Sequence, residues 1–327
     1  MTRTFLAAVL CSVAGTLGLS HVAAAQSFPA KDKPISIIVG FTPGGGIDTQ
    51  ARAVAQKLSE NLGVPVVVEN RPGASTIVAT QAVMRAAPDG YTILYAPSSA
   101  MAQNPHTLNA ATYDPFNDFT PIGLAARGPL VFMVHAGLPV NSLPELVDYI
   151  KANPGKTSYA SFGTGTSSHI VGEVFARNNG LDAQHIAYKG GSDAARDLLA
   201  GRVEYMIDAA PSGLTSASTG KARMLAVVAP ERSKYMPDVP TVKEAGVEGL
   251  DLPSWTGFYG PKGIPADVLK TLNDALAKSL RDPDVIRIFE TGAYEPSPTT
   301  PEEFAKITRD SYEQWGGIIR AAGIEKQ

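Results

Sequence analysis

The chain has 327 residues, and its 28 Lys and Arg against 31 Asp and Glu give a formal net charge of −3. A chain of this length can bury two cores of ordinary domain size. The slightly acidic balance and the lack of a basic run argue against a nucleic-acid-binding protein.

Residues 1–25 have the pattern of a signal peptide. Arg3 gives a positive n-region, residues 5–19 form the apolar h-region, and Ala23-Ala24-Ala25 is a small-residue site, so we expect cleavage after Ala25. The apolar run of about 15 residues is shorter than the ~20 that span a bilayer. Cys11 is the only cysteine, so the mature chain is expected to have no disulfide and no thiol nucleophile. The predicted location is the periplasm.

A glycine-rich turn connects the first predicted strand to the first predicted helix. Apolar residues at 35 and 37–39 precede the turn, and apolar positions at helical spacing run from Ile47 to Leu62. Consecutive glycines let the backbone approach a bound group, and a helix start points unpaired N–H groups and partial positive charge at the turn. This combination predicts an anion site. Its candidate residues are Phe41, Thr42, Gly44, Gly45, Gly46, Ile47 and Asp48.

Asp48 at the start of this helix has two interpretations. As a structural residue it is an N-cap or a first-turn carboxylate that the helix dipole favours. Direct contact with a ligand would require a cationic group on that ligand. The glycines can also serve packing alone, although three in succession cost chain entropy and so favour a binding role.

The next hundred residues alternate between strand and helix patterns. Residues 64–69 and 91–96 are predicted strands, and the helix between them ends before Pro88. Pro65 belongs at the start of its strand or on a sheet edge. The resulting βαβαβ order predicts a mostly parallel sheet whose strand ends face a common edge, where ligands of open α/β sheets bind.

A second strand, glycine turn and helix follow after Asp114-Pro115. The predicted strand 159–162 leads into a turn whose hydroxyl residues can donate hydrogen bonds to a carboxylate. The structural alternative is that Ser167 or Ser168 caps the following helix. The third glycine of a dinucleotide fingerprint is missing, because Ser168 occupies its position. The candidate residues of this turn are Phe162, Gly163, Thr164, Gly165, Thr166, Ser167, Ser168 and His169.

The remaining sequence completes two predicted lobes. Strands are predicted at 130–134, 185–188, 203–207 and 224–228, and helices at 143–152 and 192–200. The aromatic stretch 255–260 is interpreted as a crossing segment, with Trp255 packed in a core. Helices at 266–280, 284–289 and 301–322 are expected to pack on the first lobe. The predicted domains are 26–126 with 250–327, and 127–249.

Signals for an enzyme are weak. No Gly-x-Ser-x-Gly elbow occurs. His169 and Glu173 are one helical turn apart, but without a third ligand nearby a structural histidine is expected rather than a metal site. Lys189 is expected to be an exposed or ion-paired lysine, and Asp208 is either a loop cap or a cleft carboxylate. No metal and no cofactor are predicted.

Eight segments occur in an order that resembles one known family, the periplasmic receptors of tripartite tricarboxylate transporters, also called the Bug (Bordetella uptake gene) family. The resemblance covers essentially the whole mature chain. The segments are 34–48 (PISIIVGFTPGGGID), 67–73 (VVENRPG), 88–94 (PDGYTIL), 118–122 (DFTPI), 159–169 (YASFGTGTSSH), 188–190 (YKG), 237–241 (PDVPT) and 255–257 (WTG).

The resemblance implies an α/β periplasmic binding protein of type II, whose two lobes close on a small ligand. It implies that both glycine turns hold a ligand carboxylate, partly through ordered water, and that Ser98 and Asp208 also face the cleft. The sequence departs from the family at Ala74-Ser75-Thr76, where a glycine-rich run is usual.

The expected function is a monomeric, non-enzymatic receptor that captures a small mono- or dicarboxylate for inner-membrane transporter subunits. One alternative is a receptor that presents its closed form to a membrane sensor kinase. Another is an exported α/β hydrolase or lyase that uses Asp208, Lys189 or His169. The identity of the carboxylate depends on side chains that the sequence does not place.

Overall fold

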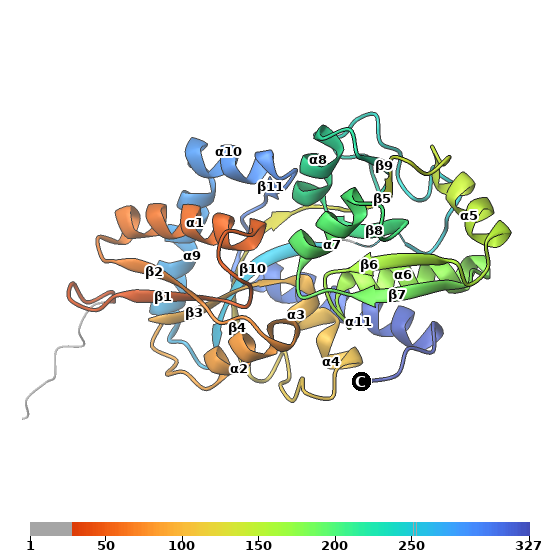
Figure 1. Cartoon of the computed structure of the whole chain (residues 1–327). Coiled ribbons are helices and arrows are strands. Elements are labelled where there is room, and N and C mark those ends of the chain that lie inside the picture. The colour runs from red at the N-terminus through yellow and green to blue at the C-terminus, as the bar shows by residue number, and fades with distance from the viewer. Residues whose placement is uncertain (1–27, 251, 253) are drawn as a thin grey trace, which may run out of the picture.

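The computed structural model describes residues 28–250, 252 and 254–327, and the predicted signal peptide lies outside this part of the chain. The helices and strands form two α/β lobes, each built around one sheet (Figure 1). Among the described residues, no helix has both the length and the apolar character required to cross a membrane.

The first sheet has the strand order β11-β4-β10-β3-β1-β2. Its β1 (Ile35–Val39) pairs in parallel with both β2 (Val66–Asn70) and β3 (Thr92–Pro97), and the crossovers contain α1 (Gly46–Leu62) and α2 (Ile77–Met84). The predicted βαβαβ unit is therefore confirmed. Because the three strands are parallel, the segments that follow β1 and β3 lie at the same edge of the sheet.

The aromatic stretch predicted to be a crossing segment is instead a strand. β10 (Trp255–Pro261) runs antiparallel between β3 and β4 (Phe119–Arg127), and every one of its residues is buried. Gly257 allows the close packing here, since a Cβ atom at this position would lie 2.1 Å from Cζ of Phe304. Trp255 is a core residue as expected, and its Nε1 donates a hydrogen bond to Oγ of Ser311 at 2.9 Å.

All three C-terminal helices contact the first lobe as expected, and the last of them also reaches the second lobe. α9 (Ala266–Leu280) and α10 (Pro283–Thr291) do pack against α1, and the two-residue strand β11 (Glu295–Pro296) pairs with β4. The last helix, α11 (Pro301–Ala321), begins in the first-lobe core and ends in the second, where its Trp315 and Ile319 are buried. A helix of 21 residues is about 30 Å long, which is enough to contact both lobes.

The second sheet has the strand order β7-β6-β8-β5-β9. Its β6 (Thr157–Ser161) pairs in parallel with β7 and β8, whereas β5 lies antiparallel between β8 and β9. The helices α5, α6, α7 and α8 surround this sheet (Figure 1). The bounds are β5 (Leu130–His135), α5 (Leu143–Ala152), α6 (Ser167–Asn179), β7 (Ala183–Ala187), α7 (Gly191–Leu199), β8 (Tyr205–Ala209), α8 (Ala210–Ser218) and β9 (Ala222–Val228).

The chain passes between the two sheets twice. It leaves the first sheet at Arg127 and enters the second at Leu130, and it leaves the second at Val228 and returns at Trp255. We propose on this basis that the lobes comprise residues 26–126 with 250–327, and residues 127–249.

Candidate functional site

The first loop, residues 41–48, leads into α1, and the start of this helix has no side-chain cap among the described residues. Gly45 is the N-cap of α1, in an extended conformation, and no side chain of the described residues caps this helix start. Gly44 has a φ of +83°, which a glycine adopts without strain. The first N–H groups of α1 therefore remain available to a bound acceptor.

Asp48 fixes the shape of this loop. It lies in the first turn of α1 as expected, but Gly45, not Asp48, is the N-cap. Its Oδ2 accepts hydrogen bonds from the Gly44 N–H and from Nε of Arg52, both at 2.9 Å, and its Oδ1 accepts one from Nδ2 of Asn70 at 2.8 Å. Burial opposes ionisation, but the bonds from Arg52, Gly44 and Asn70 outweigh it and lower the pKa of Asp48. The carboxylate thus holds the loop together.

The second loop, residues 162–169, also leads into an uncapped helix. Thr166 is the N-cap of α6, and within the described chain it makes no capping bond, so the alternative in which Ser167 or Ser168 caps the helix is wrong. These two hydroxyls point elsewhere: that of Ser168 donates to the carbonyl of Ile207, and that of Ser167 donates to Oε1 of Gln103 at 2.7 Å.

The second loop contacts the first lobe directly. Besides the bond between Ser167 and Gln103, Oγ of Ser75 donates to the carbonyl of Thr164 at 3.0 Å. A Cβ atom added at Gly165 would lie 2.8 Å from Cδ2 of Leu108. The two lobes are therefore in contact through the loop predicted to bind the ligand.

Ser75 is a residue that sequence analysis did not select. It lies in a short 3-10 turn (Ala74–Thr76) whose three residues have positive φ values of 45°, 53° and 78°. Such a conformation is uncommon without glycine and is often found at functional sites. The signal was present in the sequence, because this is the segment that departs from the glycine-rich run of the family. Gln103 carried no comparable signal.

Several buried polar atoms lack hydrogen-bond partners among the described residues, and three of them lie near the end of β8 or in residues 98–103, which follow β3. They are Oγ of Ser98, Nε2 of Gln103 and Oδ2 of Asp208. Ser98 begins the short helix α3 (Ser98–Ala102) directly after β3, and Asp208 lies near the end of β8. Because buried polar atoms are nearly always hydrogen-bonded, these three are candidates for contact with a ligand or a bound water.

Asp208 makes the stability of the ligand-free protein depend on pH. Burial raises its pKa from 3.8 to about 6, against the lowering effect of the nearby Ser212 hydroxyl and of the hydrogen bond from the Ala209 N–H. Because the folded pKa exceeds the unfolded one, this contribution to stability is fully present below about pH 4 and is lost as the pH rises through about 6. The shift corresponds to about 3 kcal/mol.

We expect Asp208→Asn to remove this pH dependence. Relative to the variant, the wild type should lose about 3 kcal/mol of unfolding free energy between pH 4 and pH 8, as measured by urea denaturation without ligand. Asp182→Asn, which changes an exposed carboxyl of the same lobe, serves as the control. An equal difference between wild type and Asp208→Asn at both pH values would contradict the expectation.

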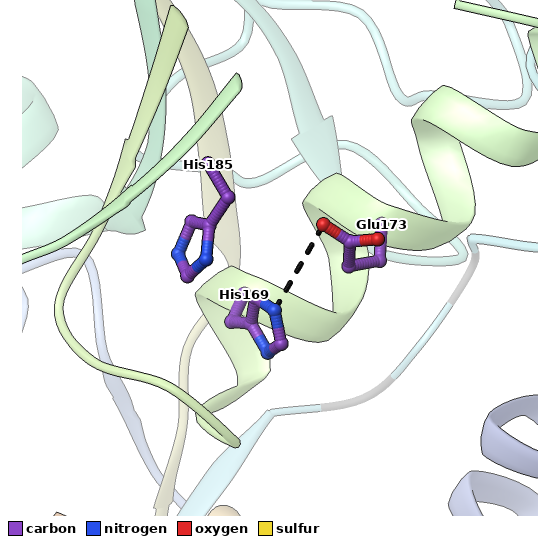
Figure 2. A group of neighbouring side chains, drawn as sticks. All are labelled: His169, Glu173 and His185. Carbon is purple, nitrogen blue, oxygen red and sulfur yellow. Dashed lines mark ion pairs between the residues drawn. The ribbon is translucent and has the colours of Figure 1, made fainter. Parts of the chain in front are cut away.

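The expectation that His169 and Glu173 have no third neighbour is wrong. His185 on β7 lies beside them, and one donor atom from each of the three residues falls within 4.8 Å of the others (Figure 2). This neighbour could not be predicted from the sequence, because His185 reaches His169 only through the pairing of β6 with β7. That pairing places His185 opposite Tyr159. Burial lowers the pKa of His169, and burial together with the charge of His169 lowers that of His185 to about 4.

Hydrogen bonds within the chain already engage one side-chain nitrogen or oxygen atom of each of these three residues. The Gly165 N–H donates to Nδ1 of His169 at 3.2 Å, so the proton of the neutral ring is on Nε2, which faces Oε1 of Glu173 at 3.9 Å. Oγ of Ser161 lies 2.7 Å from Nε2 of His185, and the Tyr159 hydroxyl donates to Oε1 of Glu173 at 2.6 Å. This tautomer favours a hydrogen-bonded network over metal coordination.

The apolar residues predicted at the site are anchored in the cores of their own lobes. Phe41 and Ile47 pack on the first-lobe core, and Phe162 packs on the second. Lys189 is exposed, as expected. Each loop therefore combines an apolar residue anchored in its own lobe with backbone N–H groups at a helix start, an arrangement that can bind an anion.

Comparison with known proteins identifies one family. A family model described as "Tripartite tricarboxylate transporter family receptor" matches residues 50–324. Protein BugT of Bordetella pertussis is 33% identical over 99% of this chain and 99% of its own length.

Solved structures of similar proteins have the same fold. The periplasmic binding protein BugD is 33% identical, with a TM-score of 0.84 over 91% of this chain and 100% of that one. R. palustris Rpa4515, whose structure contains adipate, is 31% identical, with a TM-score of 0.85 over 92% of this chain and 100% of that one. The two-lobed α/β architecture is therefore that of a periplasmic binding protein.

Proposed function

The chain belongs to the tripartite tricarboxylate transporter receptor family, and we propose that it captures a small organic carboxylate between its two lobes for an inner-membrane transporter. The family is one of transport receptors, not enzymes, and we propose the same of this chain. We also propose that residues 1–25 direct export and that the mature protein acts in the periplasm.

One observation carries the proposal: the two glycine loops begin α1 and α6 without side-chain caps in the described residues, one in each lobe. Uncapped helix starts provide N–H donors and partial positive charge, which suit a carboxylate. The loops comprise the predicted ligand-binding residues, namely Phe41, Thr42, Gly44–Asp48 and Phe162–His169. The adipate in the Rpa4515 structure supports a ligand of this chemistry.

Closure of the lobes is the proposed basis of capture. The bonds from Ser75 to Thr164 and from Ser167 to Gln103 join the second loop to the first lobe. A ligand that contacts both lobes stabilises this joined arrangement, because neither lobe alone supplies both loops. Ser98 and Asp208 each have a buried oxygen atom that lacks a hydrogen-bond partner among the described residues, and we propose that these two residues contact the part of the ligand that lies away from the carboxylate held by the two loops.

A thermal-shift screen of mono- and dicarboxylates, aromatic acids and amino acids tests the function. A ligand at 100 times its Kd adds about 2.7 kcal/mol to the free energy of unfolding. For a protein of this size that corresponds to a rise in Tm of roughly 5 °C. We expect at least one carboxylate to give such a shift. A response to neutral sugars or to cationic compounds, with none to any acid, would contradict the proposal.

A further inference from the structure

His169 closes the second loop through a backbone hydrogen bond. Its ring lies in the first turn of α6 and is buried, and its Nδ1 accepts the bond from the Gly165 N–H at 3.2 Å. Gly165 has a φ of +77°, so its peptide is held in a conformation that few other residues adopt. The Nδ1 atom therefore determines where this turn of the loop points its N–H groups.

Neighbouring residues fix the ring of His169 in place. It stacks on His185 with ring centroids 4.2 Å apart, and its Nε2 faces Glu173, as Figure 2 shows. Glu173 is held in turn by the hydroxyl of Tyr159. The ring is thus oriented on two sides by residues of the second lobe.

The same histidine pair also holds the other end of the loop. His185 contacts Oγ of Ser161 at 2.7 Å, and that oxygen accepts a hydrogen bond from the Gly163 N–H at 3.2 Å. Gly163 and Gly165 are therefore anchored by neighbouring imidazoles, while the loop between them accepts the bond from Ser75 of the first lobe. The polar atoms of this network form their hydrogen bonds with other residues of the second lobe.

His169 belongs to the loop predicted to bind the ligand, but we propose that it is a positioning residue of this loop, which acts through Nδ1 and the Gly165 N–H and does not itself contact the ligand. This inference rests on the proposed function only for its effect on affinity. The structural part of the inference, that Nδ1 of His169 holds the loop through the Gly165 N–H, can be tested without any ligand.

Two substitutions separate the role of Nδ1 from that of the rest of the ring. The side chain of His169→Asn can place its Oδ1 where Nδ1 lies and still accept from Gly165. The longer side chain of His169→Gln reaches the position of Nε2 and leaves Gly165 without its acceptor. A residue that served only to fill space would respond to both changes alike.

The first readout is hydrogen exchange of the Gly165 amide, measured by NMR on the ligand-free full chain labelled with ¹⁵N-glycine. We expect exchange at least about tenfold faster in His169→Gln and little changed in His169→Asn. Unchanged exchange in His169→Gln would overturn the proposal. So would a rise in Tm with one equivalent of Zn²⁺ that is lost in His185→Ala, because metal binding at Nε2 requires the other tautomer.

The second readout is the affinity for the carboxylate found in the thermal-shift screen. We expect His169→Gln to bind about tenfold more weakly and His169→Asn to bind within about threefold of wild type. Equal losses in both variants would indicate a space-filling role or a direct ligand contact, and either would overturn the positioning role. A wild type that binds no carboxylate would refute the proposed function, whereas the exchange experiment would still decide the role of His169.

Discussion

Replacement of Gly165 by valine is expected to weaken carboxylate binding by more than about 1000-fold while both lobes remain folded. A Cβ atom at this position would lie 2.8 Å from Cδ2 of Leu108 and 3.0 Å from Oγ1 of Thr107. Both neighbours belong to the first lobe, so the added side chain separates the second loop from its partner. The second loop supplies one half of the proposed carboxylate site. A 1000-fold loss of affinity corresponds to about 4 kcal/mol of binding free energy, since each tenfold change is about 1.4 kcal/mol.

Gly180→Val is the matched control for this experiment. Gly180 follows the end of α6 with a φ of +62°, so valine there suffers similar backbone strain. A Cβ atom at Gly180 meets no described atom within 4 Å, and the residue lies far along the helix from the loop. We expect the control to be less stable than wild type but to keep its affinity, as measured by calorimetry after circular dichroism has confirmed folding. Equal affinities in the two variants would contradict the role given to Gly165.

The two loops could be predicted from the sequence because their signal is local. A strand pattern, glycines and a helix pattern follow one another within about 20 residues, and strand–turn–helix geometry then determines where the N–H groups point. The parallel pairing of β1, β2 and β3 could be predicted for a related reason, since the right-handed crossover rule needs only the order of the elements.

The contacts between distant segments could not be predicted in this way. The neighbourhood of His169 and His185 depends on the register of β6 with β7, and the bond between Ser167 and Gln103 depends on how the lobes approach each other. The path of α11 is a similar case, because its apolar positions predict a buried face without indicating that the two ends are buried in different lobes. β10 was not predicted to be a strand, because a strand covered on both faces lacks the alternating pattern of a half-exposed one.

The charge of the ligand is expected to have the other large effect. A carboxylate accepts hydrogen bonds on both oxygens, and bonds to a charged group contribute about 1.5–3 kcal/mol each. The corresponding amide replaces one oxygen with an NH₂ group, which would face the N–H donors of α1 and α6 instead of accepting from them. Loss of two such bonds amounts to about 4 kcal/mol, so the amide should bind about 1000-fold more weakly than the acid.

Calorimetric titration of the protein with the acid selected by the screen, and with its amide, most directly tests whether the two loops hold a carboxylate. The two compounds have nearly the same size and shape, so the comparison isolates the charge and the hydrogen-bonding pattern. A carboxylate held by two uncapped helix starts predicts an amide that binds about 1000-fold more weakly than the acid. Equal affinities for the acid and the amide would contradict it.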